Sequence, residues 1–495
     1  MKQPLLASAV LAGAACLFCL IAILNCGGYR YGTSDQAFYV PAVVQHLNPA
    51  LFPRDRSLLQ VQARFMAYDD AAAWLVSNVG ISLPVIFLVA YLAALLLMFG
   101  AGLTIGSTLY RSNWPVALLL VLWTLRHRIT QTGANTLEAY FHPRMLACAL
   151  GLWAVACYLR GRGTLSLALV AAAFLLHPTT AVWFGIWIAV ALAWTEPRWR
   201  TAIGAFAVMA AIAAAWAIAR GPLQGHLARM DPRWASVLAG KDYIFPFDWT
   251  PTFWTVNLGY AVVILAIYRY RRRLGVALAR ESGLVAGVLA LLAVFLLMWP
   301  LMRAWIALAL QLQVSRIFWM LDLLASVYIA WLLAELMPRQ IVRAIVVMAV
   351  GIAVLRGVYV TREHRGSLIE VGLPADNWTD VMKWIAATPP GAHVLADPGH
   401  AWKYGSSVRV AGERDVYLEE VKDVALALYS RDIAMQVLAR SHDAQDFGSL
   451  TAEHARSLAA RYDLNYLVID RDLDLPLAYR NSQFRVYTLR PPAVR

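Results

Sequence analysis

Long runs of apolar residues recur along most of this chain and restrict its fold more than any other feature. They lie near 5–25, 81–108, 113–125, 144–159, 163–176, 179–195, 201–219, 251–268, 282–300, 316–337 and 341–358. A helix needs about 17–25 predominantly apolar residues to cross a bilayer. Only 15% of the 495 residues are charged, whereas soluble proteins carry about a quarter. The sequence therefore predicts an all-α polytopic membrane protein with about eleven transmembrane helices.

Arginine is concentrated in alternate connections between these runs. Five short connections hold 12 arginines in 32 residues, near 109–113, 160–162, 196–200, 269–281 and 338–343. The connections on the other side hold about 13 Lys and Arg in roughly 120 residues, and basic density in short loops marks the cytoplasmic side. This predicts a cytoplasmic N-terminus and outward-facing segments at 26–80, 126–143, 220–250 and the C-terminus. The same pattern accounts for the net charge of +13 without a nucleic-acid partner.

The first run resembles a signal peptide only in its position. No A-x-A-like cleavage site follows its apolar core, and further runs come after it, so we expect an uncleaved membrane helix. The C-terminal region contains no cysteine, and all five cysteines lie in or beside apolar runs: Cys16, Cys19, Cys26, Cys148 and Cys157. The sequence predicts no disulfide framework.

The character of the chain changes near residue 365. Short β-type runs occur at 393–397, 466–470 and 484–487, and helical patterns at 423–440 and 451–462, the second with Thr451 as a candidate N-cap. The sequence predicts a membrane domain over 1–364 and a small soluble α/β domain over 365–495 on the periplasmic face.

A long polar loop, 26–80, follows the first apolar run at once. Residues 36–47 and 57–68 carry apolar side chains at helical spacing, which predicts two helices lying along the membrane interface with their polar faces outward. Asp35 immediately precedes the first of these helices and Asp55 precedes the second. An Asp at a helix start is often only an N-cap. Each acid is therefore either a cap or a catalytic carboxylate.

Two His-Pro pairs are predicted on the same outer face, at His142-Pro143 and His177-Pro178. The run before His177 spans only about 21 Å as a helix, against about 30 Å of hydrocarbon, so we expect His177 to be recessed in the outer leaflet. Arginine side chains at the outer ends of helices can bind phosphate oxygens through two parallel hydrogen bonds. Alternatively, each His only satisfies a backbone carbonyl and each Arg only extends to the interface. The candidate phosphate-binding residues are His142, Arg144, His177, Arg303 and Arg316.

This layout resembles the GT-C superfamily of polytopic glycosyltransferases, especially bacterial members related to protein mannosyltransferases and lipid A aminoarabinose transferases. The matching features are one helix before a long outer loop, an acid soon after it (Tyr31-Gly32-Thr33-Ser34-Asp35-Gln36), and an outer C-terminal domain. The resemblance implies an inverting hexosyl- or pentosyltransferase in the bacterial inner membrane. It would take a polyprenyl-phosphate sugar as donor and a lipid, periplasmic glycan or protein as acceptor. Asp35, or else Asp55, would be the base.

The chain also departs from that superfamily. Many relatives carry adjacent acids at the first-loop site, whereas Asp35 stands between Ser34 and Gln36, and the only adjacent acids of the loop are Asp69 and Asp70. Divalent cations usually require several carboxylates, so no obligatory metal or other cofactor is predicted. Two other functions remain open. A transporter or flippase would show matched repeats and broken helices, and a non-catalytic assembly protein would use the outer domain to bind a partner.

Overall fold

The structure is a computed structural model that describes residues 2–364 and 366–490. Eight predicted spans form helices long and apolar enough to cross a membrane. They are α1 (Lys2–Asn25), α5 (Leu83–Leu109), α9 (Pro178–Thr195), α10 (Arg200–Ala219), α12 (Pro251–Arg273), α13 (Glu281–Arg303), α15 (Ile317–Glu335) and α16 (Arg339–Glu363). Three further spans form apolar helices of 12, 17 and 14 residues: α6 (Asn113–Thr124), α7 (Pro143–Leu159) and α8 (Gly163–Leu176). Every predicted span is therefore helical.

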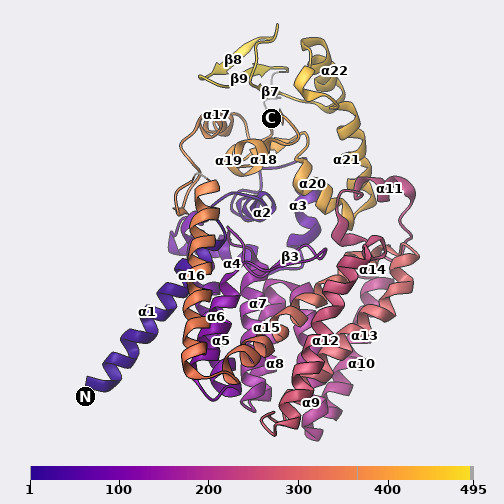
Figure 1. Ribbon diagram of the computed structural model, residues 1–495. Coiled ribbons are helices and arrows are strands. Elements are labelled where there is room, and N and C mark those ends of the chain that lie inside the picture. The colour runs from indigo at the N-terminus through magenta and orange to yellow at the C-terminus, as the bar shows by residue number, and fades with distance from the viewer. Residues whose placement is uncertain (1, 365, 491–495) are drawn as a thin grey trace.

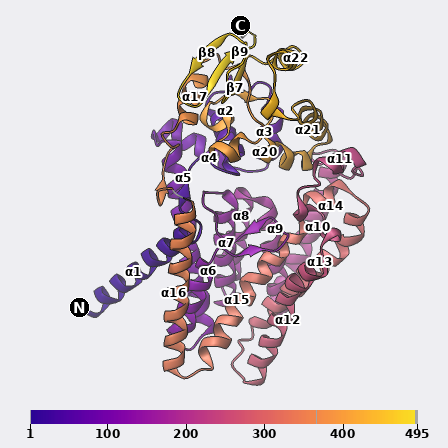
Figure 2. The same cartoon turned by 45° about the horizontal axis from the view of Figure 1, so that its top comes forward.

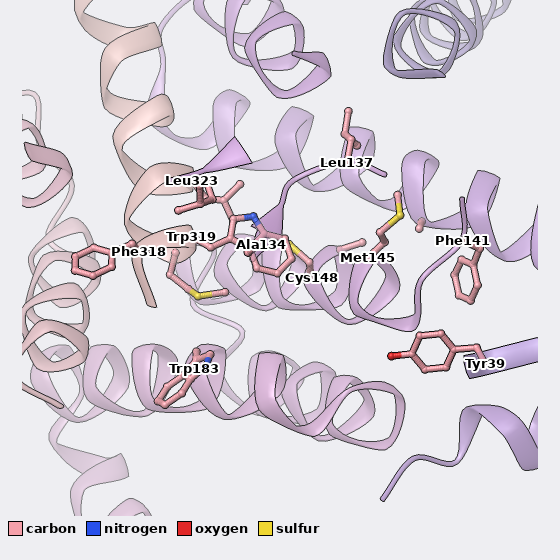
Figure 3. Close-up of a cluster of buried hydrophobic side chains, with 14 of the residues drawn as sticks. Tyr39, Ala134, Leu137, Phe141, Met145, Cys148, Trp183, Phe318, Trp319 and Leu323 are labelled. Atoms are coloured by element: carbon pink, nitrogen blue, oxygen red, sulfur yellow. The ribbon is translucent and has the colours of Figure 1, made fainter. Parts of the chain in front are cut away.

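These helices pack into one bundle, from which the first half of α1 diverges (Figure 1). Glycine allows α13 to approach α9 closely, because a Cβ atom at Gly287 would lie 2.4 Å from Trp187 Cδ1. Figure 3 shows part of the core, which includes Met145 of α7, Trp183 of α9 and Trp319 of α15. In the described chain all five cysteines are free thiols.

The arginine-rich connections lie together at one end of the bundle. Arg271 at the end of α12 pairs with Glu281 of α13 at 2.8 Å and donates to the Leu109 carbonyl at 3.3 Å. Arg280 reaches Glu196 after α9 at 3.1 Å. The grouping of these connections at one end agrees with the predicted alternation of the loops.

The first loop forms the opposite end of the bundle. It contains β1 (Tyr29–Arg30), α2 (Gln36–Leu47), α3 (Arg56–Ala63) and α4 (Tyr68–Trp74). The prediction of one helix over 57–68 was wrong at its end. The chain turns after Ala63, and the N–H of Ala67 donates to the Leu175 carbonyl of α8 at 2.8 Å. The expected exposed polar face of α2 was also wrong, since nine of its residues are buried. Both faces of α2 are covered, because the C-terminal domain packs on it (Figure 2).

The C-terminal domain is built around a five-stranded sheet in the order β6-β5-β7-β9-β8. The strands are β5 (His393–Leu395), β6 (Asp415–Val416), β7 (Tyr466–Ile469), β8 (Leu477–Arg480) and β9 (Arg485–Thr488). β5 pairs in parallel with β6 and β7, and β9 pairs antiparallel with β7 and β8; Val394 opposes Tyr466, and Val468 opposes Val486. The domain helices are α17 (Asn377–Ala386), α18 (His400–Tyr404), α19 (Val408–Ala411), α20 (Glu420–Leu426), α21 (Arg431–Asp443) and α22 (Ala452–Tyr462).

Most predicted elements of this domain are confirmed. Thr451 caps α22, because its Oγ1 accepts from the N–H of His454 at 3.2 Å. The single helix expected over 423–440 was wrong. It is divided into α20 and α21, because Ser430 caps a new helix by accepting from the N–H of Ile433 at 3.4 Å.

Several contacts fasten the C-terminal domain to the bundle end. β1 pairs in parallel with β4 (Ile369–Glu370). Trp234 of α11 (Pro232–Val237) donates to the Ala427 carbonyl at 2.7 Å. The loop between α6 and α7, with the short strands β2 (Arg128–Ile129) and β3 (Ala134–Asn135), and the short helix α14 (Ala307–Gln311) complete this end.

Candidate functional site

A cavity of about 1090 Å³ lies where the bundle end, the first loop and the C-terminal domain meet. Part of its wall is polar and includes five of the seven predicted site residues: Asp35, His142, Arg144, His177 and Arg316. The rest is apolar and includes Phe65 and Phe174, which are also 39% and 49% exposed at the protein surface. The cavity therefore suits a ligand with one polar and one apolar part.

Asp35 occupies the residue before α2, but its side chain does not cap that helix. Its Oδ2 atom instead accepts a hydrogen bond from the Tyr140 hydroxyl at 2.9 Å, and its Oδ1 atom pairs with the Lys422 ammonium. Ser34, just before it, adopts φ +52°, a left-handed conformation uncommon for a residue with a side chain. The capping alternative is therefore excluded for Asp35, whose carboxylate lines the cavity.

The charge of Asp35 is set by its neighbours. Burial alone raises the pKa of this carboxyl group, but the positive charges of Lys422 and Arg144 outweigh burial and hold the pKa well below its usual range. Asp35 is thus ionised at neutral pH. Lys422 comes from α20 of the C-terminal domain, 387 positions further along the chain. The sequence around Lys422 does not indicate a site, because only the packing of the two domains brings Lys422 next to Asp35.

The two His-Pro pairs cap helices in the same way. Nδ1 of His142 accepts from the N–H of Arg144 at 3.0 Å, and Nδ1 of His177 accepts from the N–H of Thr180 at 3.3 Å. A backbone N–H can only donate, so neither Nδ1 atom carries a proton, and the neutral ring has its proton on Nε2. The His142 and His177 ring centroids are 5.5 Å apart. Both histidines are therefore placed as Nε2–H donors at helix N-termini.

These donors border the carboxylate and the cavity. His142 Nε2 lies 3.4 Å from Asp35 Oδ2 and 3.4 Å from the Tyr39 hydroxyl, and Figure 3 shows that hydroxyl directed inward from α2. Burial and then the charge of Arg144 lower the pKa of His142 well below its usual value, so this ring stays neutral. His177 is 9% exposed, and its Nε2 atom has no hydrogen-bond partner among the side chains of residues 8–61, 63–241, 243–364 and 366–490. His177 is thus an available donor within the cavity.

The predicted arginines differ in their surroundings. Arg144 pairs with the buried Glu138 at 2.9 Å, and Arg126 lies 3.5 Å from the same carboxylate. Arg316, in the turn Val314–Arg316 before α15, has no carboxylate within 4.0 Å among the side chains of residues 8–61, 63–241, 243–364 and 366–490. Arg303, at the end of α13, is exposed and does not line the cavity. Arg316 therefore places a positive charge at the cavity wall.

Asp55 lies outside the cavity. Its Oδ2 atom accepts from Arg409 Nε at 2.7 Å and from the N–H of Val416 at 3.2 Å. Arg409 also holds Asp423 at 2.6 Å, and all three charged side chains are buried. The structure separates the two candidate acids, since only Asp35 faces the cavity while Asp55 joins the first loop to the C-terminal domain.

The cavity wall carries more positive than negative charge. Among the side chains that the structure describes there, the basic ones are Arg64, Arg144, Lys241, Arg316 and Lys422, and the acidic ones are Asp35 and Asp70. Lys241, like Arg316, has no acidic partner within 4.0 Å among the side chains of residues 8–61, 63–241, 243–364 and 366–490. This excess favours an anionic ligand. Over the same ranges, no three His, Cys, Asp or Glu side chains cluster so as to hold a metal ion, and the metal-independence expected from the sequence stays a prediction.

Comparison of the chain with protein-family models and with curated protein sequences finds no match. A functional assignment must therefore be based on the chemistry of the cavity.

Proposed function

We propose that the protein is a GT-C-type glycosyltransferase that moves a sugar from a polyprenyl-phosphate donor to a lipid, glycan or protein acceptor. The observation that carries the proposal is one amphipathic cavity lined by both an ionised carboxylate, Asp35, and a guanidinium, Arg316. A phosphate would be held by Arg316 and His177, and an isoprenoid chain would leave past Phe65 and Phe174. The cationic excess of the wall supports an anionic head group.

The proposed step is a single in-line displacement. Asp35 accepts the proton of an acceptor hydroxyl or amine as the acceptor atom bonds to the anomeric carbon. The bond from that carbon to the phosphate oxygen breaks on the opposite side, its electron pair stays on the phosphate, and the anomeric configuration inverts. Arg316 and the Nε2–H of His177 stabilise the negative charge that develops on the leaving phosphate. The step needs no metal ion.

The proposed location is the bacterial inner membrane, with the N-terminus in the cytoplasm. Arginine density in the short connections supports this orientation. The first loop, the cavity and the C-terminal domain would then face the periplasm.

The test uses purified protein in liposomes with a panel of radiolabelled polyprenyl-phosphate hexoses and pentoses. We expect at least one donor to be cleaved, with free polyprenyl phosphate released and label transferred to a hydroxyl or amine acceptor. Movement of an intact sugar lipid between leaflets would support a transporter and contradict the proposal. Absence of both cleavage and polyprenyl phosphate binding would also contradict it.

A further inference from the structure

Lys422 is held on a rigid support above the cavity. The first turn of α20 is capped by Glu419, whose carboxylate accepts from the N–H groups of Val421 at 3.1 Å and Lys422 at 2.9 Å. Asp423, one residue on, is fixed by Arg409 at 2.6 Å. Since the backbone of α20 is anchored in this way, the freedom of Lys422 lies in its four-carbon side chain.

With Lys422 in place, both oxygens of Asp35 already have partners. Oδ1 is paired with the Lys422 ammonium, and Oδ2 is engaged by Tyr140 at 2.9 Å and lies 3.4 Å from His142 Nε2. An ion-paired carboxylate is also a weak base, because the ammonium stabilises its charged form. For Asp35 to remove a proton, the ammonium must first leave.

The cavity itself supplies a reason for the ammonium to leave. Lys422, Lys241 and Arg316 line the same wall. A phosphate seated among them offers several strong acceptor oxygens to a lysine side chain that is flexible and carries three donors. A ligand shifts an equilibrium by its difference in affinity for the two states, and here the state with Lys422 turned toward the phosphate is the one favoured.

We propose that Lys422 is a positioning residue that occupies Asp35 in the empty site and transfers to the donor phosphate on binding. Donor binding then frees the base, so the acceptor is activated only when a donor is present. This inference rests on the proposed function.

A double-mutant cycle on ligand affinity tests the exchange without relying on turnover. The probe is decaprenyl phosphate in detergent micelles, with decaprenol as the uncharged control lipid. Asp35→Asn removes the competing charge and is expected to tighten binding of decaprenyl phosphate about fivefold, and Lys422→Met to weaken it about tenfold. The double variant should bind decaprenyl phosphate like Lys422→Met, because without Lys422 there is no ammonium for which Asp35 and the phosphate compete.

Additional variants separate exchange from damage to the fold. Lys422→Arg should retain most of the affinity. Lys403→Met, which breaks another Lys–Asp pair of the same domain, should leave the affinity unchanged. Equal affinity of wild type and Asp35→Asn, or additive effects in the double variant, would overturn the role of Lys422. Failure of wild type to prefer decaprenyl phosphate over decaprenol would instead overturn the proposed function.

Discussion

Arg409 Nε donates a 2.7 Å hydrogen bond to Asp55 Oδ2, which joins two buried residues 354 positions apart. The same guanidinium holds Asp423 of α20. One ion-paired cluster therefore attaches the first loop to the helix that carries Lys422. Through this cluster, the packing of the C-terminal domain determines what surrounds Asp35.

Arg409→Met is expected to destabilise the protein strongly. It leaves Asp55 and Asp423 buried without their cation, and breaking a buried pair in this way costs about 3–5 kcal/mol. Arg485→Met is the control, since Arg485 pairs at 2.9 Å with Asp472, whose side chain is 82% exposed, and an exposed pair contributes at most about 1 kcal/mol. Thermal unfolding of the detergent-purified proteins measures both. Similar unfolding temperatures for the two variants would contradict the assigned role of Asp55.

Asp69→Asn is expected to stabilise the protein increasingly as the pH rises. Asp69 is buried, and neither carboxyl oxygen has a hydrogen-bond partner in the described chain. Burial, followed by the charge of Asp70, raises its pKa to about 8. Because the folded pKa exceeds the unfolded value of about 3.9, Asp69 destabilises the folded protein least below about pH 4. Between about pH 4 and pH 8, its ionisation lowers the free energy of unfolding by up to about 1.4 kcal/mol for each pH unit.

The measurement for Asp69 is the difference in unfolding temperature between variant and wild type at pH 5 and at pH 8. Asp472→Asn, on the protein surface, should show no such trend. A constant difference for Asp69→Asn would show that Asp69 does not titrate in this range.

His142 is expected to have two separable roles. His142→Asn keeps an N-cap acceptor for α7 but loses the Nε2–H beside Asp35, whereas His142→Ala loses both. The Ala variant should be less stable than the Asn variant by about 1 kcal/mol. Both should transfer sugar about tenfold more slowly, because the His142 Nε2–H that helps to hold the Asp35 carboxylate in place is missing. Equal stability of the two variants would mean that the cap contributes nothing.

Arg316 and Arg303 form a matched pair for donor binding. Arg316 lines the cavity, whereas Arg303 is exposed outside it. Arg316→Leu should weaken decaprenyl phosphate binding at least about tenfold, because a charge-assisted contact is lost, and Arg303→Leu should change it less than twofold. Equal losses would indicate a general electrostatic effect rather than a site at Arg316.

The membrane helices could be predicted because a long apolar run in lipid satisfies its own backbone hydrogen bonds only as a helix. Two predictions were wrong for different reasons, one because of a distant contact and one because of a local cap. The polar side of α2 is covered by a domain that begins more than 300 residues later, and α20 and α21 are separate because Ser430 starts a new helix. The apolar periodicity of the sequence indicates neither the covering of α2 nor the helix start at Ser430.

The site could be predicted only in part. Asp35 was distinguished by its place after the first helix, and His142 and His177 by the prolines that follow them. Asp55 satisfied the same positional rule as Asp35, and the sequence alone could not separate them. Lys422 and Glu138 acquire their partners through tertiary packing, which their own neighbours in the sequence do not reveal.

The most direct measurement is the single-turnover transfer rate of Asp35→Asn with a bound radiolabelled donor. We expect a rate at least about a hundredfold below wild type, with donor affinity equal to or tighter than that of wild type. Asp70→Asn, at another acid of the cavity wall, should transfer at nearly the wild-type rate. A folded Asp35→Asn protein that transfers sugar as fast as wild type would contradict the role of Asp35 as the base.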